Sequence, residues 1–143
     1  MNPVQRLITS ALVALAIVAG LGACSKEEAA PAALVRLGPE EFAARMGNSG
    51  AEVINVHIPY EGELEDTDAF IPFDQIVGDT ALPADKGSEV LLYCMTGRMS
   101  VTAGDALTAA GYTDVSHLEG GMRAWEAAGK TLLHNTQESG PGH

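Results

Sequence analysis

Cys94 is the residue of this chain whose type and setting most clearly predict chemistry. It follows the apolar, strand-forming run Val90–Tyr93 and opens the segment Met95–Ser100, which leads into a helical pattern. Backbone N–H groups converge where a helix begins, and the helix dipole favours an anion there. Such a setting stabilises the thiolate, which is the nucleophilic form of cysteine. The sequence therefore predicts sulfur chemistry at one residue.

The residues after Cys94 form a candidate substrate-binding loop, which consists of Met95, Thr96, Gly97, Arg98, Met99 and Ser100. We expect this loop to wrap around the sulfur with its amide groups directed inward as an anion site. Gly97 suits an unusual backbone conformation, and Thr96 and Ser100 offer hydroxyl donors. Arg98, the only cation of the loop, either guides an anionic donor to the sulfur or lies solvated at the surface.

The chain begins with a segment typical of protein export. A weakly basic start, Met1–Arg6, precedes the apolar stretch Leu7–Leu21, which is shorter than the roughly 20 residues of a membrane-spanning helix. Residues 21–24, Leu-Gly-Ala-Cys, resemble the bacterial lipobox, in which the cysteine is lipidated and becomes the first residue. We therefore expect residues 1–23 to be a lipoprotein signal peptide and Cys24 to anchor the protein to a membrane. The alternatives are an ordinary cleaved signal and an uncleaved anchor helix.

Lipidation of Cys24 has a consequence for Cys94. The chain has two cysteines, so an acylated Cys24 leaves Cys94 as the sole thiol and no internal disulfide can form. A free thiol is unusual in an exported protein, because extracytoplasmic compartments tend to oxidise it. The alternative is a cysteine that only fills space in the core, which is common for free cysteine.

The charge balance excludes some partners. The 143 residues hold 8 basic and 19 acidic side chains, a formal net charge of −11. Nucleic-acid binding needs a basic surface, so we expect none. The negative field also repels anionic substrates over a Debye length of about 8 Å at physiological salt. An anion site therefore has to be built from local groups.

Patterning along the chain predicts one α/β domain. We expect a lipidated cysteine and flexible tether at 24–33, the folded domain at 34–133 and a disordered tail at 134–143. Predicted strands lie at 34–37, 51–56, 71–76, 89–93 and 114–117, and predicted helices at 39–46, 100–110 and 121–128. This alternation is typical of a largely parallel sheet, whose working site lies beyond the carboxyl ends of the strands. Cys94 lies at such an end.

Two motifs at a fixed separation resemble the rhodanese-like domain family. Tyr93–Ser100 reads Tyr-Cys-Met-Thr-Gly-Arg-Met-Ser, and Leu118–Trp125 reads Leu-Glu-Gly-Gly-Met-Arg-Ala-Trp. Val53–Val56 and Phe70–Pro72 resemble earlier landmarks of the family, so the resemblance covers roughly residues 34–133. It implies a single rhodanese-like α/β domain with a mainly parallel sheet flanked by helices on both faces.

The resemblance also implies a function. Members of the family transfer a sulfane sulfur through a cysteine persulfide, which gives Cys94 the catalytic role. A thiosulfate-like donor would load the sulfur, and a thiophilic acceptor, either a small molecule or a protein, would remove it. No cofactor is implied. With the lipid anchor on Cys24, the expected location is the cell envelope, on a bacterial membrane facing the periplasm or the exterior.

The chain departs from the family pattern at three places. Many relatives carry Arg at the fifth position after the cysteine, where this chain has Met99, and Arg98 comes one residue earlier. The usual Asp-Val-Arg is replaced by Asn55-Val56-His57, which predicts the loss of an ion pair. A bulkier segment that includes Phe73 replaces the usual Gly-His-Ile-Pro-Gly-Ala. Met99 and Phe73 predict a more apolar mouth and a donor or acceptor other than thiosulfate and cyanide.

Other polar residues have simpler interpretations. His57 and His117 lack the spacing of metal ligands, so we expect no metal site. The acidic run from Glu61 to Asp68 is predicted to be a solvated loop, and the sequence leaves open whether it or His57 contributes to the site. Trp125 is expected in the core.

Two other functions stay open at this point. A non-catalytic carrier of sulfur or redox equivalents, or an accessory binding lipoprotein, would need the same fold without turnover. A cysteine phosphatase would use a similar loop, but such enzymes typically place Arg at the sixth position after the cysteine, where this chain has Ser100.

Overall fold

The structure is a computed structural model that describes residues 30–134 of the chain. The predicted signal peptide, Cys24, most of the tether and all but the first residue of the predicted tail lie outside the described residues. The helices are α1 (Pro39–Met46), α2 (Arg98–Ala109) and α3 (Gly121–Ala127). The strands are β1 (Val35–Leu37), β2 (Glu52–Asn55), β3 (Glu63–Leu64), β4 (Ala69–Phe70), β5 (Val90–Tyr93), β6 (Val115–Leu118) and β7 (Leu132–Leu133).

A five-stranded parallel sheet in the order β1-β6-β5-β2-β4 forms the centre of the fold. In its register Leu92 of β5 pairs with Ile54 of β2 and with His117 of β6. All four residues of β5 are buried, as expected for a central strand covered on both faces. The short strands β3 and β7 form a separate antiparallel pair. The prediction of an α/β fold with a mainly parallel sheet is confirmed.

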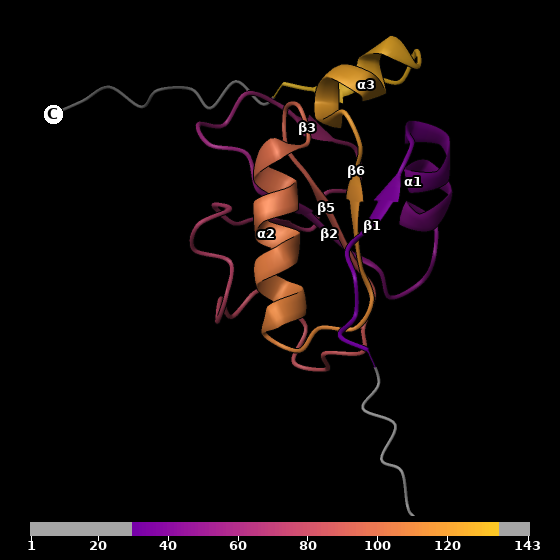
Figure 1. The fold of residues 1–143 in the computed structure, drawn as a ribbon. Helices are drawn as coiled ribbons and strands as arrows, with labels where there is room; N and C mark the ends of the chain where they lie inside the picture. Colours follow the sequence, from indigo (N-terminus) through magenta and orange to yellow (C-terminus); the bar gives the residue numbers. More distant parts are fainter. Residues whose placement is uncertain (1–29, 135–143) are drawn as a thin grey trace, which may run out of the picture.

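Helices cover both faces of this sheet (Figure 1). On one face, Ala103 and Leu107 of α2 pack into a core cluster with Leu92. On the other face, Phe42 of α1 and Trp125 of α3 belong to a second core cluster, and their rings meet edge to face with centroids 6.3 Å apart. Full burial of a Leu or Phe side chain contributes about 1.5–3 kcal/mol to the free energy of unfolding. The sheet therefore holds the end of β5 in a fixed position.

One predicted strand is wrong. The segment 71–76 runs as turns, and the edge strand is β4, which pairs with Ile54 and Asn55 of β2. Ile71 and Ile76 are buried because their side chains pack into the core. The Ile71 and Phe73 N–H groups still donate to the carbonyls of Asn55 and Val56, at 3.0 and 3.1 Å. The chain then turns, with the Gln75 N–H donating to the Pro72 carbonyl at 2.9 Å.

Helix α2 begins at Arg98, two residues before the predicted start. Arg98, Met99 and Ser100 therefore belong to its first turn, and the irregular loop after Cys94 is only three residues long. Gly97 precedes the helix with a φ of 95°, a left-handed conformation that favours glycine. Within residues 30–134, no helix is both long and apolar enough to cross a membrane.

Candidate active site

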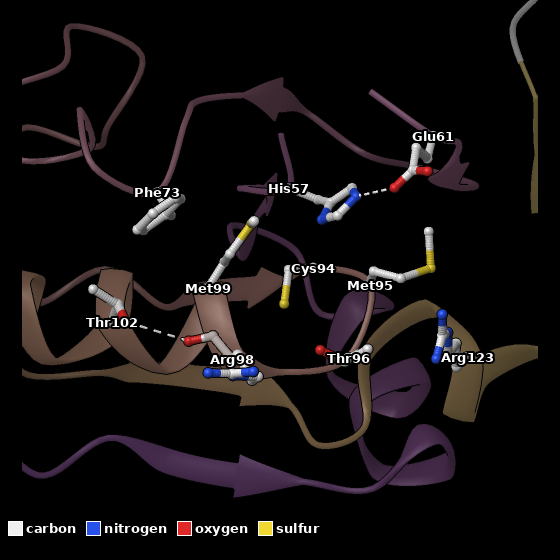
Figure 2. A pocket seen from close by; sticks show the side chains of 10 residues that line it. All are labelled: His57, Glu61, Phe73, Cys94, Met95, Thr96, Arg98, Met99, Thr102 and Arg123. Atoms are coloured by element: carbon white, nitrogen blue, oxygen red, sulfur yellow. Dashed lines mark hydrogen bonds and ion pairs between the residues drawn. The ribbon is translucent and has the colours of Figure 1, made fainter. Parts of the chain in front are cut away.

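Cys94 lies immediately after β5, at the floor of a cavity of about 560 Å³ (Figure 2). The residue is 1% exposed, and its side chain forms part of the lining of this cavity. The cavity is lined by His57, Glu61, Phe73, Cys94, Met95, Thr96, Arg98, Met99, Thr102 and Arg123. Four of the six predicted loop residues are among them. The other two, Gly97 and Ser100, instead lie within hydrogen-bonding reach of the sulfur itself.

Within residues 30–134, two polar groups lie within hydrogen-bonding distance of the sulfur. The Gly97 N–H donates a hydrogen bond to Sγ of Cys94 at 3.0 Å. Ser100 Oγ lies 3.7 Å from the same sulfur, close enough to accept from the thiol or to donate to the thiolate. The loop amides were expected to surround the sulfur. Within the part of the chain that the structure describes, Gly97 provides the one amide that bonds it.

Ser100 connects the sulfur to a buried histidine. Its Oγ lies 3.0 Å from Nδ1 of His117 in β6 and 3.1 Å from the carbonyl oxygen of Gly97. Nε2 of His117 is buried with no hydrogen-bond partner among the described residues. Because an unpaired buried N–H is costlier than an unpaired lone pair, the proton belongs on Nδ1, which donates to Ser100. The Ser100 hydroxyl is then left as a donor, either to Gly97 or to the sulfur.

Burial keeps His117 neutral. The low polarity around the ring, and secondly the guanidinium of Arg36, lower the pKa of His117 below its ordinary value of 6.5. The carboxylates of Glu119 and Asp105 act in the opposite direction and are weaker. A neutral ring with its proton on Nδ1 is the form that orients the Ser100 hydroxyl.

Helix α3 holds the other side of the loop. The Met122 N–H donates to the carbonyl of Cys94 at 2.8 Å, and the Arg123 N–H donates to the carbonyl of Met95 at 3.1 Å. Gly121 makes this approach possible, because a Cβ on it would lie 2.5 Å from the carbonyl carbon of Met95. Its φ of 60° is also left-handed. The second motif therefore needs glycine at position 121, because its backbone packs directly against Cys94 and Met95 of the first motif.

His57 enters the cavity from the end of β2, opposite the α2 side. Its ring is buried, and Nε2 pairs with the carboxylate of Glu61. Asn55 fixes this turn, since its Oδ1 accepts from the His57 N–H at 3.0 Å and its Nδ2 donates to the Gly62 carbonyl at 3.0 Å. The ion pair of the usual Asp-Val-Arg cannot form with Asn55 in the first position, and His57 instead pairs with the carboxylate of Glu61.

The acidic run is also more than a solvated loop. Glu61 pairs with His57, and Asp68 accepts a hydrogen bond from the Val53 N–H at 2.8 Å. Leu64, within the same segment, is fully buried. These three roles depend on tertiary contacts: Glu61 with His57, Asp68 with Val53 of β2, and Leu64 with the core. The charge pattern of the segment alone did not indicate them.

The cavity wall combines apolar and cationic side chains. Phe73, Met95 and Met99 supply the apolar surface, and the predicted places of Phe73 and Met99 at the mouth agree with the structure. In the view of Figure 2, Arg98 and Arg123 lie on opposite sides of the sulfur. Arg123 was not predicted as a site residue. The signal that could have identified it was its place two residues after Gly121, inside the second motif.

The fold and the site together define an α/β domain that presents one cysteine on a loop after its central parallel strand. The sequence matches the family model for the rhodanese-like domain over residues 35–128. The chain belongs to the rhodanese-like domain family.

One relative at the sequence level is an uncharacterized protein from Synechocystis sp., 31% identical over 97 residues. The match covers 66% of this chain and 54% of that protein, so the chain spans about half the length of the relative.

Solved structures share the fold at low identity. The rhodanese-like domain of an Anabaena sp. protein is 20% identical with a TM-score of 0.60, covering 80% of this chain and 87% of that chain. A rhodanese-related protein from Thermoplasma volcanium is 20% identical with a TM-score of 0.58, covering 69% and 97%. A Rhodopseudomonas palustris protein described as a possible tyrosine phosphatase is 20% identical with a TM-score of 0.58, covering 69% and 84%.

Proposed function

We propose that this protein is a sulfurtransferase that carries a sulfane sulfur as a persulfide on Cys94. The observation that carries the proposal is the position of Sγ, at the floor of a cavity with the Gly97 amide 3.0 Å away. The rhodanese-like family, to which the chain belongs, includes sulfurtransferases.

The first half of the reaction takes a thiosulfate-type donor. The Cys94 thiolate attacks the outer sulfur of thiosulfate, the S–S bond of the donor breaks, and sulfite leaves with the electron pair. The two products, Cys94–S–S⁻ and sulfite, together carry the same charge as the thiolate and thiosulfate. The Gly97 N–H and the Ser100 hydroxyl are placed to stabilise the negative charge on Sγ of the attacking thiolate. Arg98 and Arg123 provide local positive charge at the cavity against the net charge of −11.

We further propose that the protein works outside the cytoplasm, held to a bacterial membrane by acyl chains on Cys24. The support is the Leu-Gly-Ala-Cys motif after an apolar N-terminal stretch. The test is detergent partitioning of the expressed full chain and its Cys24→Ser variant. Wild type is expected in the detergent phase with a lipid-modified N-terminal cysteine. If wild type and Cys24→Ser partition equally and no lipid is found, the proposed anchor is wrong. The proposed sulfur chemistry does not depend on that result.

The activity is tested by steady-state turnover of the purified full chain with thiosulfate or polysulfide and a thiol acceptor. Wild type is expected to turn over, and Cys94→Ser is expected to be inactive. Hydrolysis of an aryl phosphate without sulfur transfer would favour a phosphatase instead. The absence of both activities with every donor would favour a carrier or binding role.

A further inference from the structure

The His57–Glu61 pair lies in the same cavity as Cys94 and is not used by the first half of the proposed reaction. His57 is 7% exposed, and its Nε2 is occupied by the Glu61 carboxylate. In Figure 2 the second ring nitrogen, Nδ1, is directed toward the space above the Cys94 sulfur. Attack on thiosulfate moves no proton from the donor. A second half-reaction with a protonated acceptor does need a base.

The partners of His57 determine which nitrogen is basic. An ionised carboxylate only accepts hydrogen bonds, so the proton of the neutral ring belongs on Nε2, facing Glu61. Nδ1 then carries a lone pair toward the cavity. Asn55 holds both the His57 amide and the Gly62 carbonyl, which keeps the turn and the pair in place. The other charged groups at the cavity are Arg98 and Arg123.

We propose that His57, oriented by Glu61, is the base that takes the proton from the acceptor, and that the acceptor is a neutral thiol with an apolar body. This inference rests on the proposed sulfurtransferase function. The acceptor R–SH gives its proton to Nδ1 of His57, and the resulting thiolate bonds to the outer sulfur of Cys94–S–S⁻. The S–S bond to Cys94 breaks, and Sγ leaves with the electron pair. The products are R–S–S⁻, the Cys94 thiolate and protonated His57 paired with Glu61, and the charge balances.

The cavity suits this class of acceptor. An ordinary thiol has a pKa of about 8.5, so at neutral pH most of it is protonated and gains from a base. Phe73, Met95 and Met99 offer an apolar surface that small inorganic anions cannot use. The net charge of −11 also disfavours an acceptor that arrives as an anion.

The test isolates the second half-reaction. The full chain is first loaded with sulfur from thiosulfate, and the discharge of the persulfide is followed in a single turnover. The acceptors are 2-mercaptoethanol, a more acidic aromatic thiol, and sulfite, which needs no base. The variants are His57→Phe and Glu61→Gln. The matched control is Glu65→Gln, which removes the same charge from an exposed residue of the same segment outside the cavity.

General-base catalysis contributes about 10²–10⁴-fold, so His57→Phe is expected to slow discharge to 2-mercaptoethanol by at least a hundredfold. We expect a smaller loss with the acidic thiol and a change below about twofold with sulfite. Glu61→Gln is expected to slow the 2-mercaptoethanol reaction about tenfold, and Glu65→Gln should match wild type. The side chain of Glu61 is half-exposed, so this variant keeps the test valid if His57→Phe unfolds.

Two results would overturn the inference. If His57→Phe slows discharge to sulfite as much as discharge to the thiols, His57 has a structural role only. If His57→Phe leaves discharge to all three acceptors unchanged, His57 takes no part in the reaction. In both of these cases Cys94 would still be loaded with sulfur from thiosulfate at the normal level. Failure of wild type to load any sulfur would instead overturn the proposed function, and the inference with it.

Discussion

The hydroxyl of Ser100 bridges the ring of His117 and the sulfur of Cys94. It lies 3.0 Å from Nδ1 of His117 and 3.7 Å from Sγ. Both Ser100 and His117 are buried, so water does not compete for these contacts. His117 is therefore a positioning residue, which acts on the sulfur by leaving the Ser100 hydroxyl free to donate.

Removing the bridge is expected to slow sulfur loading. A hydrogen bond to a charged group contributes about 1.5–3 kcal/mol, so Ser100→Ala should lower the single-turnover rate with thiosulfate about tenfold to a hundredfold. His117→Phe should produce a similar loss, whereas His117→Asn, which keeps a donor near Nδ1, should restore much of the rate. The double variant Ser100→Ala/His117→Phe should be no slower than Ser100→Ala. Additive losses would contradict a shared pathway.

The buried His117 predicts a pH dependence of stability. Its pKa is lowered in the folded protein from 6.5, so below that pH the unfolded chain binds more protons than the native state. The free energy of unfolding contributed by His117 is therefore fully present above pH 6.5 and is lost as pH falls below that value through the lowered pKa of the folded state. Urea unfolding at a series of pH values checks this. The difference between wild type and His117→Asn should shrink in acid, and a constant difference would contradict the prediction.

The backbone contact at Gly121 predicts a large loss of stability on substitution. A Cβ there would enter the carbonyl group of Met95, which cannot move without breaking the hydrogen bonds from α3. Gly121→Ala should cost about 3 kcal/mol or more and abolish sulfur loading.

Gly129→Ala is the matched control for this substitution. Its φ of 79° is also left-handed, but a Cβ at Gly129 would meet no described atom within 4 Å beyond its own chain neighbours and helix backbone. The control should cost only about 1–2 kcal/mol, and equal costs for the two variants would argue against the contact at Gly121.

Charge at the cavity should govern the affinity for thiosulfate. Arg123→Gln is expected to raise KM severalfold with little change in the melting temperature, because the guanidinium lines the cavity. Arg36→Gln is the control, since its exposed side chain pairs with Glu119 outside that cavity. If both variants raise KM equally, only the net charge of the protein affects thiosulfate binding, and the position of Arg123 at the cavity does not.

Salt provides a separate test of the net field. Added salt screens the repulsion between the −11 charge and an anionic donor, so turnover of thiosulfate should rise with ionic strength. A flat or falling rate, measured up to about 0.5 M salt, would show that Arg98 and Arg123 dominate the approach.

The sequence predicted the scaffold better than the contacts within the site. Pro39 and Gly47 marked the ends of α1, and the uninterrupted apolar run identified β5 as a buried strand. The segment 71–76 was misassigned because Ile71 and Ile76 are both buried, as in a strand, although the regular pairing with β2 ends at Phe70. A hydrophobic pattern predicts which side chains are buried. Whether the backbone pairs as a strand depends on the neighbouring segment in the tertiary structure.

The contacts of the site depend on register and turns. Ser100 meets His117 because β6 lies beside β5 with His117 paired to Leu92, a register that no local pattern specifies. His57 meets Glu61 because the chain bends at Ile58 and Pro59, which lie between them. The residue types were visible in the sequence, but their proximity depends on tertiary structure.

The most direct test of the central claim is peptide mass mapping of the full chain after incubation with thiosulfate and removal of excess donor. We predict one additional sulfur atom per chain, located on the peptide that contains Cys94, and its release on addition of a thiol. An unmodified Cys94 peptide with every sulfane donor, or added sulfur on other residues only, would contradict the account.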